Sequence, residues 1–448
     1  MRAIPMMFEQ EEALKSMIPI FPAQDIEKRI GIPIPSVTIA GMYPFVFDSV
    51  KDPGAGTLLG VDSSGGVVLF NQFLYQIKKE NNRNDGNIII MGPGDSGKST
   101  AAKMLLRTHL RNGLKCVCID PKGELEEIAQ IMNGDFIDMG KGGDFGMINP
   151  LEIIVDADED EIAQGLGYTV LTRAVQQLKA FIKYFKPTIE EPVLKLFGDI
   201  VQDTYKRFKI DYNTDFTRLT SQDFPTFNDV YATVKGRLLS MTDATQERDA
   251  MEKLEIILRP IVNEYKYYFT GHTSLQLYSD FVVFNIRDLM NSDDKIKNAL
   301  LFNILKYAWG LCLDKNINTV MMIDDSHLLL EDHNELGAEF LAQIQRRSRK
   351  YNTGTIIVNN HPSDFAAPNV IMHGKTIFDS TTYCLIMGLK KQVSEELSKL
   401  IDLNETEKEG IKYYTQGQAL FICGNRRMNI QIICSQEELD SFGSNSIL

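Results

Sequence analysis

The sequence lacks a long apolar run: no stretch approaches the ~18 residues that a helix needs to cross a bilayer. The N-terminal segment Met1–Glu12 also has no apolar signal core, because acidic residues interrupt it from Glu9 onward. We therefore expect a protein that is soluble, or at most peripheral to a membrane.

Cysteine is scarce as well, and its spacing argues against a zinc site. Of the six cysteines, Cys116 and Cys118 alternate within a predicted strand, so both thiols face the same side. No pair of His or Cys residues nearby supplies the remaining ligands. We interpret the cysteines as reduced core residues of a cytosolic protein.

Basic residues are outnumbered, since 47 Lys and Arg stand against 60 Asp and Glu, a formal net charge of −13. This balance argues against a protein whose whole surface coats nucleic acid, because Lys and Arg dominate phosphate binding, but it is compatible with a local basic strip. With 448 residues, of which 44% are hydrophobic and 24% charged, the chain has the composition of a globular protein with more than one domain.

From Asn87 onward, apolar strands alternate with helices, which is typical of a parallel sheet with helices on its faces. A helix is predicted at Ser99–Asn112, and a hairpin turning at Gly424-Asn425 closes the chain. The sequence therefore predicts an α/β fold with a mostly parallel central sheet flanked by helices. Its predicted strands are Ile88–Met91, Lys115–Asp120, Phe281–Ile286, Thr319–Ile323, Thr355–Val358, Tyr383–Met387, Ala419–Cys423 and Asn429–Cys434.

An all-α insertion is predicted within this fold, because apolar residues recur there at helical spacing, as at Leu171, Val175 and Leu178. The predicted organisation has four parts: a lead-in segment over 1–85, with two short strands near Thr57–Phe70 that pack on the core; a first part of the core over 86–155; the helical insertion over 156–278; and a second part of the core, with the C-terminal hairpin, over 279–448.

The segment Gly92–Ser99 reads Gly-Pro-Gly-Asp-Ser-Gly-Lys-Ser, which matches the P-loop (Walker A) pattern between a strand and a helix. The backbone N–H groups of such a loop converge on phosphate oxygens, so glycines are needed where a side chain would block them. We expect Lys98 to neutralise the β- and γ-phosphates and Ser99 to complete a Mg²⁺ shell, while Asp95 points away. The fold is thus predicted to be a RecA-like P-loop NTPase. The residues predicted to bind ATP are Gly92, Pro93, Gly94, Asp95, Ser96, Gly97, Lys98, Ser99 and Thr100.

The predicted strand Thr319–Ile323 runs directly into two acids, the arrangement of a Walker B element. Asp324 is expected to hold Mg²⁺ through water, and Asp325 to polarise the attacking water. The second acid of this element is usually Glu. Because the side chain of Asp325 is shorter, we expect hydrolysis to be slow or to depend on another group.

Two further polar residues follow predicted strands. Glu124, in Asp120-Pro-Lys-Gly-Glu124, is a candidate to assist or replace Asp325, or else a solvated acid at a helix start. Asn360 ends the strand that begins at Thr355. Its amide is a candidate to bond the γ-phosphate or its water, and a plain turn into Pro362 is the competing interpretation.

A basic run, Gln345-Arg-Arg-Ser-Arg-Lys350, lies on a predicted helix between two of these strands. Such a run is typical of a solvated face. In a ring ATPase, however, one arginine inserted into a neighbour's site stabilises transition-state charge, and Arg346 and Arg349 are candidates for this role. Arg426 and Arg427 are weaker candidates.

The order of these motifs resembles the conjugation ATPases of type IV secretion systems, the TraC/TraE-like proteins of the HerA/FtsK group. The resemblance covers nearly the whole chain. It is carried by the P-loop and by segments that are similar to the family's linker and strand motifs, namely Gln10–Pro19, Gly54–Gly60, Asp120–Glu124, Gly142–Leu151, Tyr268–Thr273, Arg349–Tyr351 and Pro362–Phe365.

The chain departs from the family at two positions of the site. Asp325 stands where the family usually has Glu, and Asn360 where it has Gln, which puts the hydrolysis rate in question but not ATP binding. The family also commonly carries a large N-terminal domain before its linker, so the chain is expected to be a shorter member or an ATPase-domain portion.

The resemblance implies a cytoplasmic ATP- and Mg²⁺-dependent motor, peripheral at the inner face of the cell membrane, working as a hexamer or lower oligomer. Its implied partners are membrane-embedded secretion-channel proteins and a DNA or protein substrate. Two alternatives stay open: a DNA translocase of the HerA/FtsK or coupling-protein type, and a weakly hydrolysing or non-hydrolysing module that uses ATP for assembly.

Overall fold

The computed structural model describes residues 8–17, 49–54, 56–78, 82–155, 167–241, 245–330 and 335–442, together with residues 25, 35, 36 and 38. The chain divides into two compact units, Met1–Asp48 and Ser49–Leu448. In the first unit the helix α1 spans Gln10–Met17, and the end of the predicted linker at Pro19 lies outside the described residues. In the part of the chain that the structure describes, every helix is too short or too polar to span a bilayer.

The second unit is built on an eleven-stranded sheet with the order β2-β1-β11-β10-β9-β3-β8-β7-β4-β6-β5. Every pairing from β9 through to β5 is parallel, whereas β10, β11, β1 and β2 add an antiparallel extension. The strands are β1 (Thr57–Asp62), β2 (Val67–Phe70), β3 (Ile88–Met91), β4 (Lys115–Asp120), β5 (Asp135–Asp138), β6 (Phe281–Asn285), β7 (Thr319–Ile323), β8 (Thr353–Asn359), β9 (Tyr383–Met387), β10 (Gln418–Cys423) and β11 (Arg426–Ile432).

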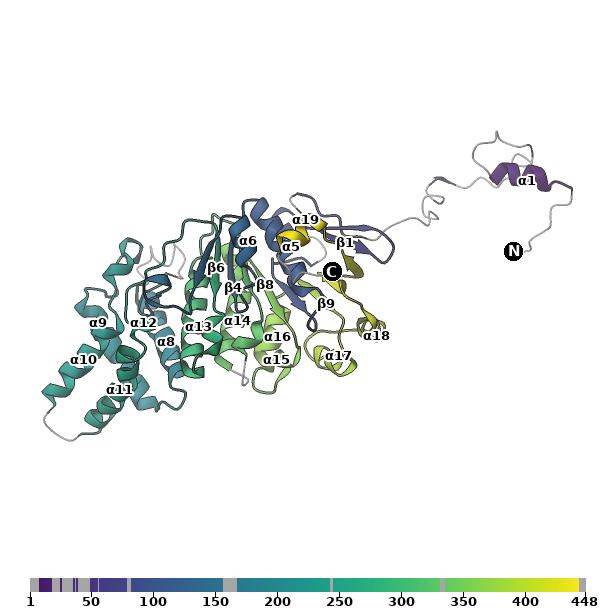
Figure 1. The fold of residues 1–448 in the computed structure, drawn as a ribbon. Coiled ribbons are helices and arrows are strands. Elements are labelled where there is room, and N and C mark those ends of the chain that lie inside the picture. The colour runs from purple at the N-terminus through teal and green to yellow at the C-terminus, as the bar shows by residue number, and fades with distance from the viewer. Residues whose placement is uncertain are drawn as a thin grey trace. The chain divides into compact units, whose positions relative to one another are not determined.

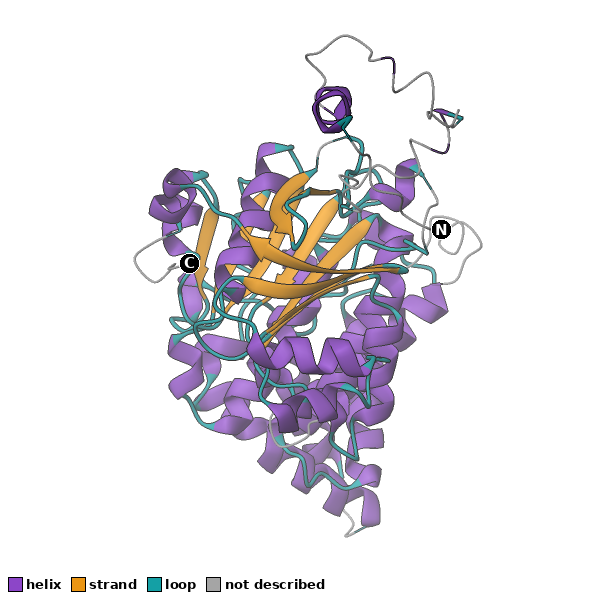
Figure 2. Cartoon of the chain, turned by 90° about the vertical axis from the view of Figure 1, so that its right-hand side faces the viewer, coloured by secondary structure: helices purple, strands orange, loops and turns teal. Residues whose placement is uncertain are grey.

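Helices cover both faces of this sheet, so its central strands are buried on both sides, as expected for parallel strands (Figure 2). Ile88 and Ile90 of β3 pack on the face that carries α5 (Lys98–Arg111) and α6 (Glu126–Ile131). Ile89 and Met91 pack on the other face, against the cluster that includes α13 (Asp294–Gly310), α14 (Glu335–Arg347) and α16 (Ile371–Asp379) (Figure 1). This layering confirms the predicted fold class.

A group of helices follows β5 in the chain and lies on the β6 side of the sheet (Figure 1). The apolar stripe of α8, which includes Leu171, Val175 and Leu178, is buried in the same core as the face of α13 that meets it. Residues 156–166, where the insertion is predicted to begin, lie outside the described residues, and the domain boundaries stay a prediction. The helices are α8 (Gly167–Phe185), α9 (Glu191–Arg207), α10 (Phe227–Ser240), α11 (Gln246–Asn263) and α12 (Lys266–Phe269).

All the predicted core strands are present, with bounds shifted at β6, β8, β10 and β11, and two differences from the prediction have a structural reason. The strand β5 is absent from the sequence-based prediction, because its four residues Asp-Phe-Ile-Asp carry little apolar signal. The last strand begins at Arg426 rather than Asn429, since Cys423 pairs with Arg426 and leaves only Gly424 and Asn425 in the turn. Shorter helices complete the unit: α4 (Leu74–Ile77), α15 (Ser363–Ala366), α17 (Lys391–Leu397), α18 (Glu405–Tyr413) and α19 (Gln436–Ser441).

The cysteines lie in the core, as predicted. Cys116 and Cys118 both belong to the cluster beneath α5, so their thiols share one face of β4. All six are free thiols and five are buried, with Cys434 partly exposed.

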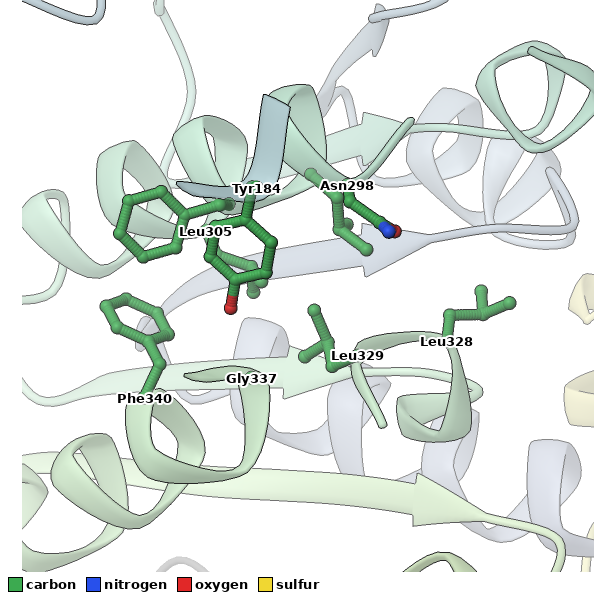
Figure 3. Close-up of a pocket in the computed structure, with 9 residues that line it drawn as sticks. Tyr184, Asn298, Leu305, Leu328, Leu329, Gly337 and Phe340 are labelled. Atoms are coloured by element: carbon green, nitrogen blue, oxygen red, sulfur yellow. The ribbon is translucent and has the colours of Figure 1, made fainter. Parts of the chain in front are cut away.

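A small apolar pocket lies where α8, α13, α14 and the turn Ser326–Leu329 meet (Figure 3). Its volume is about 10 Å³, too little for any ligand larger than a water molecule. The ring of Tyr184 points into it; Tyr184 meets Phe302 in a tilted ring contact, and Phe302 meets Phe340 edge to face. We interpret this pocket as a packing gap.

We expect acid to destabilise the fold through His109, a buried residue of α5. Burial lowers the pKa of His109 to about 4, below the ~6.5 of an exposed histidine, so the unfolded chain takes up a proton first. The contribution of the neutral His109 to the free energy of unfolding is therefore fully present above about pH 6.5. It is lost as the pH falls toward 4, and the free energy of unfolding is lower by ~2 kcal/mol at pH 5. Denaturant unfolding of the wild type and of His109→Gln at pH 7.5 and pH 5 measures this loss. The variant should lose less stability between the two pH values, and an equal loss would contradict the assignment.

Candidate functional site

The carboxyl ends of β3, β4, β7 and β8 meet at one edge of the sheet, because these strands are neighbours and parallel. A cavity of about 580 Å³ opens at this edge. The structure therefore brings together most of the residues that the motifs single out. The cavity is lined by Gly94, Asp95, Gly97, Lys98, Ser99, Thr100, Lys122, Glu124, Asp324, Asp325, Asn360 and Gln416.

The loop between β3 and α5 depends on its glycines. A Cβ atom at Gly92 would lie 2.7 Å from the Cβ atom of Met387 and 2.8 Å from Ser96 Oγ, too close for either contact. Gly97, which precedes the first helical residue, adopts a left-handed backbone with φ of +100° and offers no side chain to cap the helix. The first N–H groups of α5 therefore face the cavity without a side-chain acceptor, as phosphate binding requires.

Two polar side chains hold this loop in its curve. Lys98 Nζ donates to the carbonyl oxygen of Pro93 at 2.6 Å, and Ser96 Oγ donates to the same oxygen at 2.8 Å. Burial lowers the pKa of Lys98, and the nearby ammonium of Lys122 acts in the same direction. The side chain of Lys98 thus lies within the loop. Asp95, in contrast, is an exposed residue with a left-handed backbone.

The acids that follow β7 also line the cavity. Asp324 is 6% exposed, and its Oδ1 atom accepts the N–H of Asp325 at 3.0 Å. Burial, assisted by the charge of Asp325, raises the pKa of Asp324 to about 7. A carboxylate in this position gains from a cation beside it. Ser99, with its hydroxyl, and Asp324 are the oxygen donors that Mg²⁺ prefers, so these residues fit the predicted metal.

Protein side chains alone do not enclose a metal at this site. Among the described residues, no group of three or more His, Cys, Asp or Glu side chains is placed to hold an ion. This is compatible with Mg²⁺, which commonly takes one or two protein ligands and completes its shell with water and substrate phosphates.

Asp325 is held at both carboxylate oxygens. Lys122 Nζ lies 2.7 Å from its Oδ2 atom, and Asn360 Nδ2 donates to its Oδ1 atom at 3.2 Å. The backbone of Asp325 is left-handed, with φ of +43°, and Asp325 as a whole is only 4% exposed to solvent. Asn360 thus contacts Asp325, and its predicted bond to the γ-phosphate or its water stays a prediction.

Glu124 reaches the cavity from a turn that Asp120 organises. The carboxylate of Asp120 accepts the N–H groups of Lys122, Gly123, Glu124 and Leu125, which fixes the segment after β4. Glu124 Oε2 also lies 4.0 Å from Lys103 Nζ of α5. The turn places Glu124 in the same cavity as Asp325.

Two residues that line the cavity were missed in the sequence. Lys122 lies within the quoted Asp120–Glu124 segment, and its position two residues beyond a central strand was the signal that could have indicated it. Gln416 precedes β10 and comes near the P-loop because the N–H of Gly417 donates to Ser96 O at 3.0 Å. No local pattern marks Gln416.

The candidate arginines lie away from the cavity of their own chain. The helix α14 returns to the amino ends of the strands, where Asn87 Nδ2, just before β3, donates to Gln345 O. Arg346 is exposed there, and the Arg349 guanidinium lies 6.0 Å from the ring centroid of Tyr75. Arg427 contacts Glu407 at 2.8 Å in the antiparallel extension. A role in a neighbour's site stays a prediction.

Comparison with known proteins yields a family match and several similar structures. The family model described as TraG P-loop domain matches residues 62–418. The structure of VirB4 of Thermoanaerobacter pseudethanolicus aligns with a TM-score of 0.77 at 27% identity, over 87% of this chain and 100% of that one. The unbound monoclinic form of the bacterial conjugative coupling protein TrwBΔN70 aligns with a TM-score of 0.52 at 12% identity, over 90% of this chain and 92% of that one, which shows a common fold. An uncharacterized protein of Bacillus anthracis is 21% identical over 474 aligned positions, covering 97% of this chain and 73% of that protein.

Substitution of Gly92 by alanine should destabilise the loop. The added methyl group would collide with Met387 and Ser96, and such overpacking costs ~1–3 kcal/mol. Gly94→Ala is the matched control, because a Cβ atom at Gly94 meets nothing within 4 Å. Thermal unfolding should show a clearly lower midpoint for Gly92→Ala than for Gly94→Ala, and equal midpoints would exclude the close approach.

Proposed function

We propose that this chain, which belongs to the TraG P-loop domain family, is a Mg²⁺-dependent ATPase that energises a type IV secretion or conjugation apparatus. The observation that carries the proposal is the single cavity that gathers the P-loop, the acids after β7 and the amide after β8. Similarity to the VirB4 structure, at 27% identity over that whole chain, supports the same conclusion.

In this proposal the P-loop binds the triphosphate. The N–H groups of the loop and of the first turn of α5 surround the phosphate oxygens, and Lys98 exchanges its contact with Pro93 O for the β- and γ-phosphates. Ser99 would hold Mg²⁺ directly and Asp324 would hold it through water, and the ion would neutralise part of the charge on the phosphates. The loop residues between Gly92 and Gly97, from Pro93 to Ser96, contribute mainly their backbone groups to phosphate binding.

The proposed catalytic base is Asp325. Its carboxylate orients water against the γ-phosphate and accepts a proton from it, while Asn360 fixes the orientation of the carboxylate. Glu124 shares the cavity and is the proposed second acid, compensating for the short reach of Asp325. Arg346 and Arg349 are proposed to act on a neighbouring subunit, since they lie at the opposite edge of the sheet in their own chain.

The biological setting that we propose is the one that the sequence resemblance implies: a homo-oligomeric motor, peripheral to the inner face of the cell membrane and in contact with channel proteins that span it. The similarity to the VirB4 structure is compatible with this setting. Its work would be assembly of the apparatus or transfer of a DNA or protein substrate.

A second candidate function is an assembly module that binds ATP and turns it over slowly. It is favoured by the ion pair between Lys122 and Asp325, which occupies the proposed catalytic carboxylate. The rate of ATP turnover by the wild-type protein distinguishes this module from a motor.

Phosphate release by the purified protein tests the proposal. Lys98→Ala should lose nucleotide affinity, because the ammonium in the loop is removed. Asp325→Asn should still bind ATP but release phosphate ~10²-fold more slowly, since an amide cannot accept the proton. Asp314→Asn, on an exposed loop before β7, is the matched control and should behave like the wild type. Equal activity in Lys98→Ala, Asp325→Asn and the wild type would refute the site, and tight ATP binding without turnover by the wild type would establish the assembly module instead.

A further inference from the structure

Lys122 stands out among the residues that line the cavity, because neither the P-loop nor the Walker B pattern includes it. Its ammonium lies 2.7 Å from Asp325 Oδ2 and pairs with a carboxylate that is almost fully buried, whereas the lysine side chain itself is 49% exposed. The contact thus joins a fixed acid to a cation on a flexible stem. Such a lysine can change partner without disturbing the fold.

The second ammonium of the cavity is close by. Lys98 and Lys122 line the same space; burial lowers the pKa of Lys98, and the charge of Lys122 acts in the same direction. Two neighbouring ammonium groups repel one another, so an anion between them is stabilising. The P-loop lysine is expected beside the β- and γ-phosphates, and a neighbouring cation is therefore within the reach of the terminal phosphate.

The ion pair also occupies the acid on which turnover depends. Asp325 Oδ2 is taken by Lys122 and Oδ1 by Asn360, so both oxygens already have donors. A carboxylate that neutralises an ammonium is a poor acceptor for a proton from water. If the Lys122 ammonium moved to another anion, Asp325 Oδ2 would become free, while Asn360 would continue to orient Asp325 through Oδ1.

We propose that Lys122 is a γ-phosphate sensor, which leaves Asp325 for the terminal phosphate of ATP and so exposes the acid only when a triphosphate is bound. ADP has no γ-phosphate and leaves the Lys122–Asp325 pair intact. Lys122 would thereby determine the preference for ATP over ADP and couple it to activation of water. This inference rests on the proposed function of the same site and specifies its regulation.

The test is the ratio of two affinities. Binding of Mg-ADP and of a Mg-bound non-hydrolysable ATP analogue is measured by calorimetry for the wild type, Lys122→Met and Lys122→Arg. Loss of one charge-assisted contact corresponds to about tenfold in affinity. Lys122→Met should therefore bind the ATP analogue about tenfold more weakly while ADP affinity stays within about twofold, and Lys122→Arg should restore much of the preference.

The matched control is Lys253→Met. Lys253 is a half-exposed lysine of α11, and its Nζ atom lies 2.7 Å from Oε1 of Glu190 in another ion pair. The Lys253→Met variant should leave both affinities unchanged. A merely structural role of Lys122 would weaken both nucleotides equally, and an unchanged ratio in Lys122→Met would overturn the proposal. If the wild type binds ADP and Lys98→Ala does not, an unchanged ratio of ATP-analogue to ADP affinity in Lys122→Met rejects the sensor role of Lys122 but not the proposed function. If the wild type binds neither nucleotide, the proposed function fails with it.

Discussion

The parallel pairing of β3 with β8, β8 with β7, and β7 with β4 is the constraint on which the candidate site depends. Parallel strands end at the same edge, so segments that are far apart in the sequence arrive at one place: the P-loop after Met91, the turn at Asp120, the acids after Ile323 and the amide after Asn359. Residues on the strands themselves point into two apolar cores and are unavailable for chemistry. The residues just beyond these strand ends can meet in a polar cavity, and they make up most of its lining, to which Gln416 before β10 is added.

Electrostatic balance explains why the cavity tolerates buried acids. Asp324 and Asp325 are adjacent and almost inaccessible, an arrangement whose cost in a medium of low polarity is severe unless cations lie nearby. Lys122 supplies one positive charge by direct contact, and Lys98 supplies another across the cavity. The chain as a whole carries a net charge of −13, yet two of its lysines are concentrated where phosphates would bind. Overall charge therefore says little about this site.

Much of the fold and most of the residues that line the cavity could be predicted from the sequence, because their signals are local. The P-loop is a contiguous pattern, and central parallel strands are apolar throughout, so β3, β4, β7 and β9 have the predicted bounds. The partners of Asp325 are not local: Lys122 and Asn360 contact it only because their strands flank β7 in the sheet order. The location of Arg346 could have been derived from topology, since a helix that joins parallel neighbours must return to their amino ends. Gln416 could not, because a loop near the antiparallel extension carries it to the P-loop.

The presence of aspartate at 325, where glutamate is usual in the similar family, has a structural reason in the backbone. With φ of +43°, residue 325 lies in the left-handed region, which aspartate and asparagine occupy far more readily than residues with longer side chains. A glutamate in the same backbone would reach one bond further but would pay the steric cost of that conformation, on the order of 1 kcal/mol. Its carboxylate would also move past both Lys122 and Asn360, whose contacts are set for the shorter side chain. The short acid, its lysine partner and its amide partner therefore form one arrangement, and a change of reach at Asp325 would require both partners to change with it.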